Sequence, residues 1–215
     1  MGLCMLEELS TPRSVQTQNT KEKIYKAAVD IIKKKGYEYL SISNICKVAH
    51  ISNGTFFYHF KTKDDLLSYY VRERFIKYRE EHHFQVEGLP FDKKILEYYY
   101  CYTSYVEENG IDFTANYYTP KNMALNTRIY HEDNPQLMYE FVRYCLLEAE
   151  EEHLIKSEHT ATFYAETCCM IIKGIVFDWA LSGGKVNMHE MIDMILKTFL
   201  DSIKVTESGS DLKQE

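Results

Sequence analysis

Small and hydrogen-bonding side chains cluster in the first third of the chain, where their types suit contact with an anionic polymer. Residues 52–55 are Ser-Asn-Gly-Thr, and donors or cations follow at Tyr58, His59, Lys61 and Lys63. Hydroxyl, amide and imidazole groups hydrogen-bond phosphate oxygens and base edges, and ammonium groups attract phosphate. These residues therefore predict a nucleic-acid contact, with the small side chains placed for close approach to the bases.

The charge distribution favours an anionic partner at this end of the chain. The whole chain carries −7 at pH 7, yet residues 20–63 hold nine lysines and three acids. That segment therefore carries +6 and the remainder −13, and the interval between Tyr39 and Lys63 contains no acid. A basic segment on an acidic body confines phosphate attraction to one end. A lysine-coated helix face is the alternative interpretation of lysines 33–35.

Apolar periodicity places a helix before this segment. The helix is predicted over 21–35, with Thr20 as its N-cap and Gly36 as its stop. Its apolar stripe at helical spacing consists of Ile24, Ala27, Ala28, Ile31 and Ile32.

Two short helices joined by a tight turn come next. The first begins after Ser41, whose hydroxyl can cap it, and residues 50–52 interrupt it. Ser52 is a second cap and opens a helix through Phe60. Two short helices flanked by longer ones form the helix-turn-helix plan. The second helix of that plan enters a major groove about 12 Å wide, with its N-terminal residues facing the bases.

The rest of the chain is also helical in pattern, with no convincing strand-type alternation, so the fold class is all-α. Thr62 and Asp65 have the spacing of a capping box and start a long helix over 63–83. Further helices are predicted at 91–109, 135–155, 159–182 and 187–204, with a short irregular stretch at 112–131.

Residues 40–67, LSISNICKVAHISNGTFFYHFKTKDDLL, resemble the signature of the tetracycline-repressor (TetR) family. That signature runs Thr-Val-x-x-Ile-Ala-x-x-Ala-Gly-Val-Ser-x-Gly-Thr-x-Tyr-x-His/Tyr-Phe-x-x-Lys-x-x-Leu. The resemblance covers roughly residues 20–70, about a quarter of the chain. Matching residues at the family spacing are Gly54-Thr55, His59-Phe60, Lys63 and Leu66.

The resemblance implies two kinds of DNA contact. Phosphate contacts fix the register of the protein on the duplex, whereas base contacts choose the sequence. The family pattern assigns Ser52, Asn53 and Thr55 to base edges, Tyr58 and His59 to phosphates, Lys63 to the backbone, and Ser41 to a helix cap that can reach a phosphate.

Three positions depart from the family pattern. Phe57 stands where Tyr is usual, which removes a phosphate-directed hydroxyl but keeps a ring for stacking or for contact with a thymine methyl group. His50 replaces a turn Gly, and it costs around 1 kcal/mol if the backbone is left-handed there. Cys46 replaces an Ala, which is a modest increase in volume.

The expected architecture is an N-terminal three-helix DNA-binding domain and a larger C-terminal helical domain for ligand binding and dimerisation. The predicted segments are a flexible arm at 1–17, the DNA-binding domain at 18–78 with its helix-turn-helix at 41–60, the helical domain at 79–204 and a tail at 205–215.

Dimerisation is expected because such regulators bind near-palindromic operators as twofold dimers. The last two helices are the candidates, and the alternative is that their apolar stripes face only the protomer's own core. The predicted interface residues are Ala165, Cys168, Ile172, Ile175, Trp179, Ile192, Ile195 and Phe199.

An effector cavity is expected among the aromatic residues of the C-terminal domain. Five tyrosines fall within residues 98–105, and aromatic walls with a few hydroxyls suit a flat or hydrophobic ligand. The alternative is that these rings fill helix interfaces. The predicted lining residues are Tyr102, Tyr105, Tyr117, Phe141, Tyr144 and Cys145.

The predicted function is a homodimeric repressor that a small molecule, aromatic or hydrophobic, releases from a double-stranded operator. The ligand would act by shifting the helix over 63–83. Three alternatives stay open: a redox-sensing regulator that uses thiols such as Cys168–Cys169, a DNA binder without sequence choice, and a helical small-molecule binding protein.

An enzyme, a cofactor and a metal site are not expected. No C-x-x-C motif occurs, and the histidines 131, 153, 159 and 189 belong to no recognised nucleophile or metal motif. No segment approaches the roughly 20 apolar residues of a membrane span, and the N-terminus does not have the pattern of a signal peptide. We therefore expect a cytoplasmic protein with reduced cysteines and no membrane partner.

Overall fold

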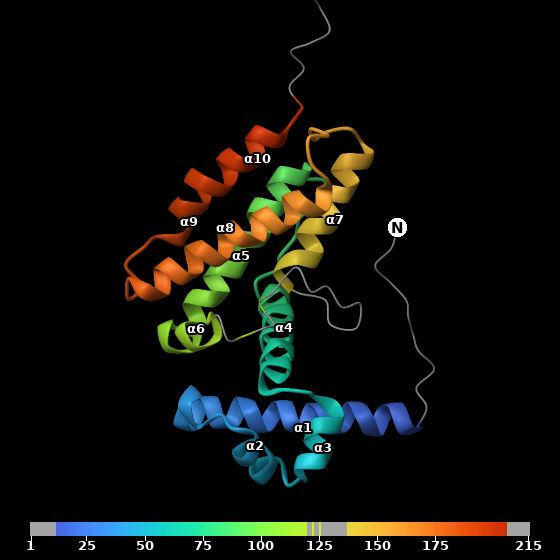
Figure 1. Cartoon of the computed structure of the whole chain (residues 1–215), viewed down its shortest axis with the longest axis vertical. Helices are drawn as coiled ribbons and strands as arrows, with labels where there is room; N and C mark the ends of the chain where they lie inside the picture. Colours follow the sequence, from blue (N-terminus) through green and yellow to red (C-terminus); the bar gives the residue numbers. More distant parts are fainter. Residues whose placement is uncertain (1–11, 120–121, 123–124, 126–136, 206–215) are drawn as a thin grey trace, which may run out of the picture. The chain divides into compact units, whose positions relative to one another are not determined.

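The computed structural model describes residues 12–119, 122, 125 and 137–205, and the regular elements of that part of the chain are helices (Figure 1). This confirms the all-α class. The chain divides into two compact units, Met1–Tyr70 and Val71–Glu215, called here the N-terminal unit and the C-terminal unit. Across the described residues, no helix has the length and apolar character that a bilayer crossing needs. The predicted tail beyond 205 and the first eleven residues of the predicted arm lie outside the described residues.

The N-terminal unit consists of three helices and the start of a fourth. The elements are α1 (Pro12–Lys35), a 3-10 turn η1 (Tyr37–Tyr39), α2 (Ile42–Ala49) and α3 (Asn53–His59). Helix α1 packs on α2, and α2 packs on α3. Their shared core is apolar: Ile24, Ala27, Ala28, Ile31, Leu40, Ile45, Cys46, Ala49, Phe56 and Phe60 are all buried. The predicted stripe of the first helix is thus the core face, except at its last position, Ile32, which is half-buried.

The first helix begins nine residues before its predicted start, at Pro12 rather than after Thr20. Thr20 is therefore not its cap: the Thr20 hydroxyl lies inside the helix and donates to the carbonyl of Gln16 at 2.9 Å. Residues 12–17, expected in a flexible arm, are helical. The C-terminal end is as predicted, because Gly36 follows with φ +90°.

The turn between α2 and α3 is tight and left-handed at one residue. His50 has φ 51° and ψ 50°, and the backbone N–H of Ile51 donates to the carbonyl of Cys46 at 3.0 Å. The Cys46 thiol donates to the carbonyl of Ser52 at 3.8 Å, which holds the end of the turn against α2. His50, which stands where the family pattern has Gly, therefore adopts a backbone conformation that is unfavourable for a residue with a side chain.

Helix α4 (Lys63–Glu81) starts in the N-terminal unit and ends in the C-terminal unit. Its start is the predicted capping box. The N–H of Thr62 donates to the Asp65 carboxylate at 2.9 Å, and the N–H of Asp65 donates to the Thr62 hydroxyl at 3.1 Å. Two backbone donors at the helix end are satisfied reciprocally, and this fixes where α4 begins.

The C-terminal unit contains the remaining helices, and all but one lie close to predicted positions. They are α5 (Phe91–Asn109), α6 (Ile111–Tyr117), α7 (Leu137–Glu151), α8 (Ala161–Leu181), and a last helix made of α9 (Met188–Met191), a π-helical turn η3 (Ile192–Leu196) and α10 (Lys197–Ile203). The exception is α6, which occupies the start of the stretch 112–131 that was predicted to be irregular. Helix α8 runs beside α7 and packs against α6 and the last helix (Figure 1). The end of the last helix is tied to the chain after α7, because Val205 N–H donates to the carbonyl of Leu154 at 3.0 Å.

Aromatic rings fill the centre of the C-terminal unit. Phe75 contacts the rings of Tyr98, Tyr102 and Tyr105 at centroid distances of 5.6, 5.3 and 5.3 Å. All four side chains are buried. Edge-to-face ring packing at these distances adds to the free energy of apolar burial. The alternative interpretation of the tyrosine cluster, as filling between helices, fits these residues.

Helix α8 is apolar on two sides, and its buried side is the one that we predicted to be the dimer interface. Ala165, Cys168, Ile172, Ile175 and Trp179 are buried within the protomer. In the last helix, Ile192 is likewise buried, Phe199 is half-buried, and Ile195 is exposed. The buried residues therefore belong to the protomer core, because α7 and the last helix cover them.

Candidate nucleic-acid interface and pocket

One face of α3 is exposed and presents the predicted DNA-contacting residues. Asn53, Gly54, Phe57 and Tyr58 are exposed, with Phe57 at 51% and Tyr58 at 71%, whereas Phe56 is buried between them. Phe56 anchors the helix in the core of the N-terminal unit and so turns its neighbours outward. Exposed aromatic rings at this density on a seven-residue helix indicate a contact surface.

The hydroxyls at the start of the two short helices act as caps. Ser41 Oγ accepts from the N–H of Asn44 at 3.2 Å, and Ser52 Oγ accepts from the N–H of Thr55 at 3.0 Å. The hydroxyls of Ser52 and Thr55 also hydrogen-bond each other at 2.9 Å. Ser52 and Thr55 therefore shape the tip of α3, and Asn53 is the predicted base-contacting residue whose side chain is exposed and belongs to no cap.

The cationic part of the interface surrounds the end of α3. The Lys63 ammonium lies 5.0 Å from the centroid of the Tyr37 ring. Burial, together with the charge of Asp64, raises the pKa of that phenol to about 12, so the ring stays neutral beside the cation. Burial and the nearby charge of Lys21 lower the pKa of His59. A neutral His59 donates one hydrogen bond, and a phosphate beside it would favour the doubly protonated form.

Sequence reasoning missed Lys21 and Lys47 as members of this surface. Lys47 is exposed on α2, and Lys21 is close enough to His59 to affect its protonation. Both lysines were counted in the basic segment, but helical periodicity assigned neither of them to a face. The position of Lys21 depends on how α1 packs in the N-terminal unit, which no local pattern specifies.

The residues predicted to line an effector cavity lie mainly inside the packed core. Tyr102 and Tyr118 share a hydrogen bond between their hydroxyls, and the Tyr105 hydroxyl donates to the carbonyl of Val71 at 3.3 Å. Tyr117 stacks on Phe113 with ring centroids 5.9 Å apart. These contacts place Tyr102, Tyr105 and Tyr117 in the packed interior of the C-terminal unit.

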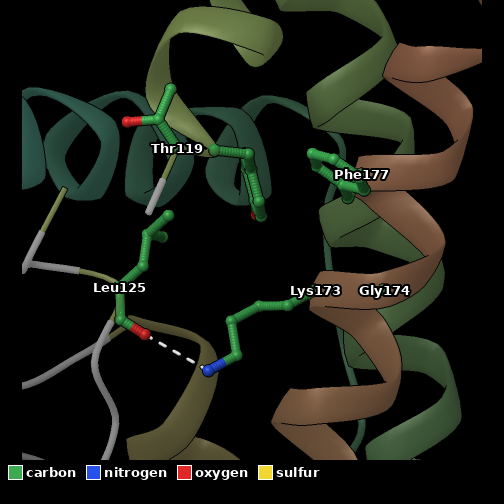
Figure 2. Close-up of a pocket in the computed structure, with 6 residues that line it drawn as sticks. Thr119, Leu125, Lys173, Gly174 and Phe177 are labelled. Carbon is green, nitrogen blue, oxygen red and sulfur yellow. Dashed lines mark hydrogen bonds between the residues drawn. The ribbon is translucent and has the colours of Figure 1, made fainter. Parts of the chain in front are cut away.

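The other three predicted lining residues, Phe141, Tyr144 and Cys145, are not among those that line the pocket shown in Figure 2. Phe141 stacks on Tyr98 with a centroid distance of 4.5 Å. Cys145 is buried, and Tyr144 is 56% exposed on the surface of α7. Tyr144 therefore cannot line an internal cavity, because the turn of α7 directs it to solvent.

A pocket of about 300 Å³ opens instead beside α8 (Figure 2). It lies between the residues that follow α6 and one side of α8, with Leu125 and Phe177 on opposite sides (Figure 2). The lining residues are Tyr118, Thr119, Leu125, Lys173, Gly174 and Phe177. The sequence carried one usable signal for this site: Lys173 is the single basic residue in the apolar helix α8.

The cysteines of the described chain are buried or half-buried and carry protonated thiols. Burial raises the pKa of Cys145 and Cys169 to about 12, and it raises the pKa of Cys168 well above its usual value. Because the thiolate is the form that is oxidised or alkylated, these groups are chemically quiet at neutral pH. The redox-sensing alternative therefore gains no support from Cys168–Cys169.

An apolar face is left uncovered on the outer side of α8 and the last helix. On α8 its residues are Phe163, Met170, Phe177 and Leu181, and on the last helix they are Met194 and Ile195, all of them exposed. Their spacing on α8 is seven, seven and four, which follows one side of a helix. An uncovered apolar stripe on two neighbouring helices marks a surface for association.

Comparison with known proteins agrees with the geometry of the N-terminal unit. A family model described as bacterial regulatory proteins, tetR family, matches residues 24–70. The HTH-type transcriptional regulator QacR of Staphylococcus aureus is 30% identical over 107 residues, which cover 50% of this chain and 52% of QacR. The HTH-type transcriptional regulator YvdT of Bacillus subtilis is 42% identical over 52 residues, which cover 24% of this chain and 27% of YvdT. The matches thus span about a quarter and about half of these two relatives.

The fold is shared over a greater length than the sequence. FadR of Thermus thermophilus, a TetR family transcriptional repressor solved in complex with lauroyl-CoA, superposes with a TM-score of 0.66 at 19% identity. The superposition covers 88% of this chain and 98% of FadR. The family match runs from α1 through the turn and α3 into α4, so residues 24–70 are similar to the tetR family of bacterial regulatory proteins, and the helical fold of FadR is shared over most of the chain.

Proposed function

We propose that the protein is a DNA-binding transcriptional regulator that acts as a homodimer on a near-palindromic operator. The observation that carries this proposal is the exposed face of α3, where Asn53, Gly54, Phe57 and Tyr58 stand in a segment that contains no acid between Tyr39 and Lys63. A helix of this size enters the major groove, and the surrounding lysines neutralise phosphates.

Dimerisation is assigned to the outer apolar face of α8 and the last helix, defined by Phe163, Met170, Phe177, Leu181, Met194 and Ile195. A twofold dimer presents two copies of α3, and these read half-sites about 34 Å apart along the duplex. Burying this face against a second copy removes several large apolar side chains from water, which favours association by roughly 25 cal/mol per Å².

Regulation by a small molecule is the second part of the proposal. FadR of Thermus thermophilus carries lauroyl-CoA in its solved complex, so a member of the family with this fold accepts a small molecule. In the present chain α4 belongs to both units, and a ligand that distinguishes two positions of α4 would change operator affinity. Coupling of this kind is typically about 1–3 kcal/mol.

The test begins with selection of an operator from random DNA duplexes, followed by affinity measurements at several salt concentrations. Lys63→Ala should weaken binding to every sequence and reduce the salt slope by about one unit at most. Asn53→Ala should instead change the preferred bases, and it leaves the cap made by Ser52 and Thr55 intact. Lys197→Ala, at an exposed lysine of α10, is the matched control and should change neither quantity.

Two outcomes would contradict the proposal. Equal losses on every sequence from Lys63→Ala and Asn53→Ala would refute the division between phosphate and base contacts. Equal affinity of the unmodified protein for selected and random duplexes would favour the alternative of a DNA binder without sequence choice.

A further inference from the structure

The pocket beside α8 has mainly apolar walls and one charged lining residue. The Tyr118 ring, Leu125 and Phe177 supply apolar surface, and Lys173 supplies the one charged group among the lining residues. Of the described residues, no carboxylate lines the pocket and none forms an ion pair with Lys173. An uncompensated ammonium at an apolar hollow attracts an anionic group and repels a cationic one.

The Lys173 side chain is held in place but keeps donors to spare. Its ammonium donates to the carbonyl of Leu125 at 3.2 Å, across the lower edge of the pocket in Figure 2. An ammonium group has three N–H donors, so two remain for a ligand. The hydrogen bond to Leu125 fixes the position of the charge at the rim, with the apolar walls on its inner side.

Two other lining residues, Gly174 and Tyr118, determine the shape and polarity of the space available to a ligand. Gly174 has no side chain, and a Cβ built there would meet no atom within 4 Å, so free space lies in front of α8 at this turn. The Tyr118 hydroxyl is engaged with the Tyr102 hydroxyl and donates to Met138 Sδ at 3.4 Å. Tyr118 therefore offers the pocket its ring, and its hydroxyl connects the pocket wall to α5 and α7.

We propose that this pocket binds a compact apolar molecule that carries one carboxylate, with the Lys173 ammonium as the counter-charge. This inference rests on the proposed function, because it names the chemical class of the effector of that regulator. A volume of about 300 Å³ is at the small end of ligand pockets, so the apolar part is short. A ligand that contacts the Tyr118 ring can shift this side chain, whose hydroxyl is bonded to Tyr102 of α5 and Met138 of α7. Ligand binding can therefore change the packing of these two helices.

The experiment compares three probes that share a chain and differ in head group: decanoate, 1-decanol and decylammonium, each below the concentration at which it forms micelles. Binding to the full-length protein without DNA is measured by calorimetry. Decanoate should bind, and 1-decanol should bind about tenfold more weakly, because it lacks the charge-assisted hydrogen bond. Decylammonium should not bind measurably.

Three variants locate the site. Lys173→Met keeps most of the length of the side chain without its charge and should reduce decanoate affinity to that of 1-decanol. Lys173→Arg should retain most of the affinity. Gly174→Leu fills the space in front of α8 and should abolish binding of decanoate and 1-decanol, while helix content stays unchanged.

The outcomes separate this inference from the proposed function. If decanoate fails to bind, binds no better than 1-decanol, or binds Lys173→Met as well as the unmodified protein, the inference is overturned while operator binding stands. A different result would be that Gly174→Leu no longer dimerises and the unmodified protein does not bind decanoate. A second copy of the chain would then fill the pocket, and the inference would be overturned. Decanoate binding in the expected order with no operator recognition would overturn the proposed function and leave the pocket assignment in place.

Discussion

The two units differ in what directs their functional side chains. In the N-terminal unit, hydrogen bonds between residues three apart fix the helix starts: Ser41 to Asn44 and Ser52 to Thr55. Once α3 begins at Asn53, the burial of Phe56 turns Phe57 and Tyr58 outward. In the C-terminal unit a bond of the same kind, from the N–H of Phe163 to the Thr160 hydroxyl at 3.2 Å, starts α8 but does not decide which side of the helix is covered. The covered side of α8 is set by packing against α7 and the last helix, which precede and follow it in the chain.

The largest expected effect tests the outer apolar face of α8. Met170 is 61% exposed and central on that face. Met170→Glu would place an unpaired carboxylate in the dimer interface, at a cost of several kcal/mol. We expect dimers to dissociate at micromolar concentration in sedimentation equilibrium, with helix content unchanged. Leu154→Glu, at an exposed apolar residue away from this face, is the control and should remain dimeric.

The next largest effect is on protomer stability, and it distinguishes the buried side of α8 from the exposed side through two residues that are only two positions apart. Ile172 is fully buried, so Ile172→Ala should lower the free energy of unfolding by about 3 kcal/mol, within the usual range for such a change. Met170→Ala should leave the stability of the protomer within about 1 kcal/mol, because it removes little buried surface. Denaturant titrations at two protein concentrations distinguish protomer stability from association. A loss of dimers in Ile172→Ala at unchanged protomer stability would restore the interface predicted from the apolar stripe.

The same difference explains how much of the molecule could be predicted from sequence. Cap residues, the Thr62–Asp65 pair and the left-handed His50 act within a few residues, and the helices that they bound were predicted closely. Thr20 was the exception, because a cap residue inside a longer helix can bond the preceding turn instead, as it does to Gln16.

The faces of the C-terminal helices could not be predicted from periodicity. Apolar residues lie on both sides of α8, from Ala165 and Ile172 on one side to Met170 and Leu181 on the other. Two stripes of similar character give no local reason to choose the core face. The tyrosines of α5 posed the same difficulty: an aromatic residue such as Tyr102 can line a cavity or fill it, and its partner Tyr118 comes from a separate helix end.

A smaller effect is expected at the turn of the N-terminal unit. His50 has a left-handed backbone, and replacing it by Gly should stabilise the segment by about 1 kcal/mol, because the steric penalty of a Cβ disappears. Ala49→Gly, one residue earlier and inside α2, should destabilise by about the same amount. Amide hydrogen exchange of residues 42–59 in the full-length protein measures both changes. Shifts of the same sign in the two variants would contradict the role assigned to the turn.

The smallest effect concerns Phe57, whose exposed ring stands on the second turn of α3 above Gly54. A phenyl ring cannot donate to phosphate, but it can contact the C5-methyl group of thymine in the major groove. Replacing single thymines of the selected operator by deoxyuridine removes that methyl group. Each half-site should contain one thymine whose replacement weakens binding. The loss of binding free energy for one such replacement should be near 0.8 kcal/mol, about fourfold in affinity, which is the value of one buried methylene-sized group.

The control for this last effect is the Phe57→Ala variant on the same set of duplexes. It should bind the thymine and deoxyuridine operators equally at that position, because the ring that senses the methyl group is gone. Phe57→Tyr should keep the discrimination, since its ring is unchanged, and should bind all duplexes somewhat more tightly through a restored hydroxyl. If Phe57→Ala still discriminates thymine from deoxyuridine, another residue of α3 reads that base, and the exposed ring contributes only to the surface around it.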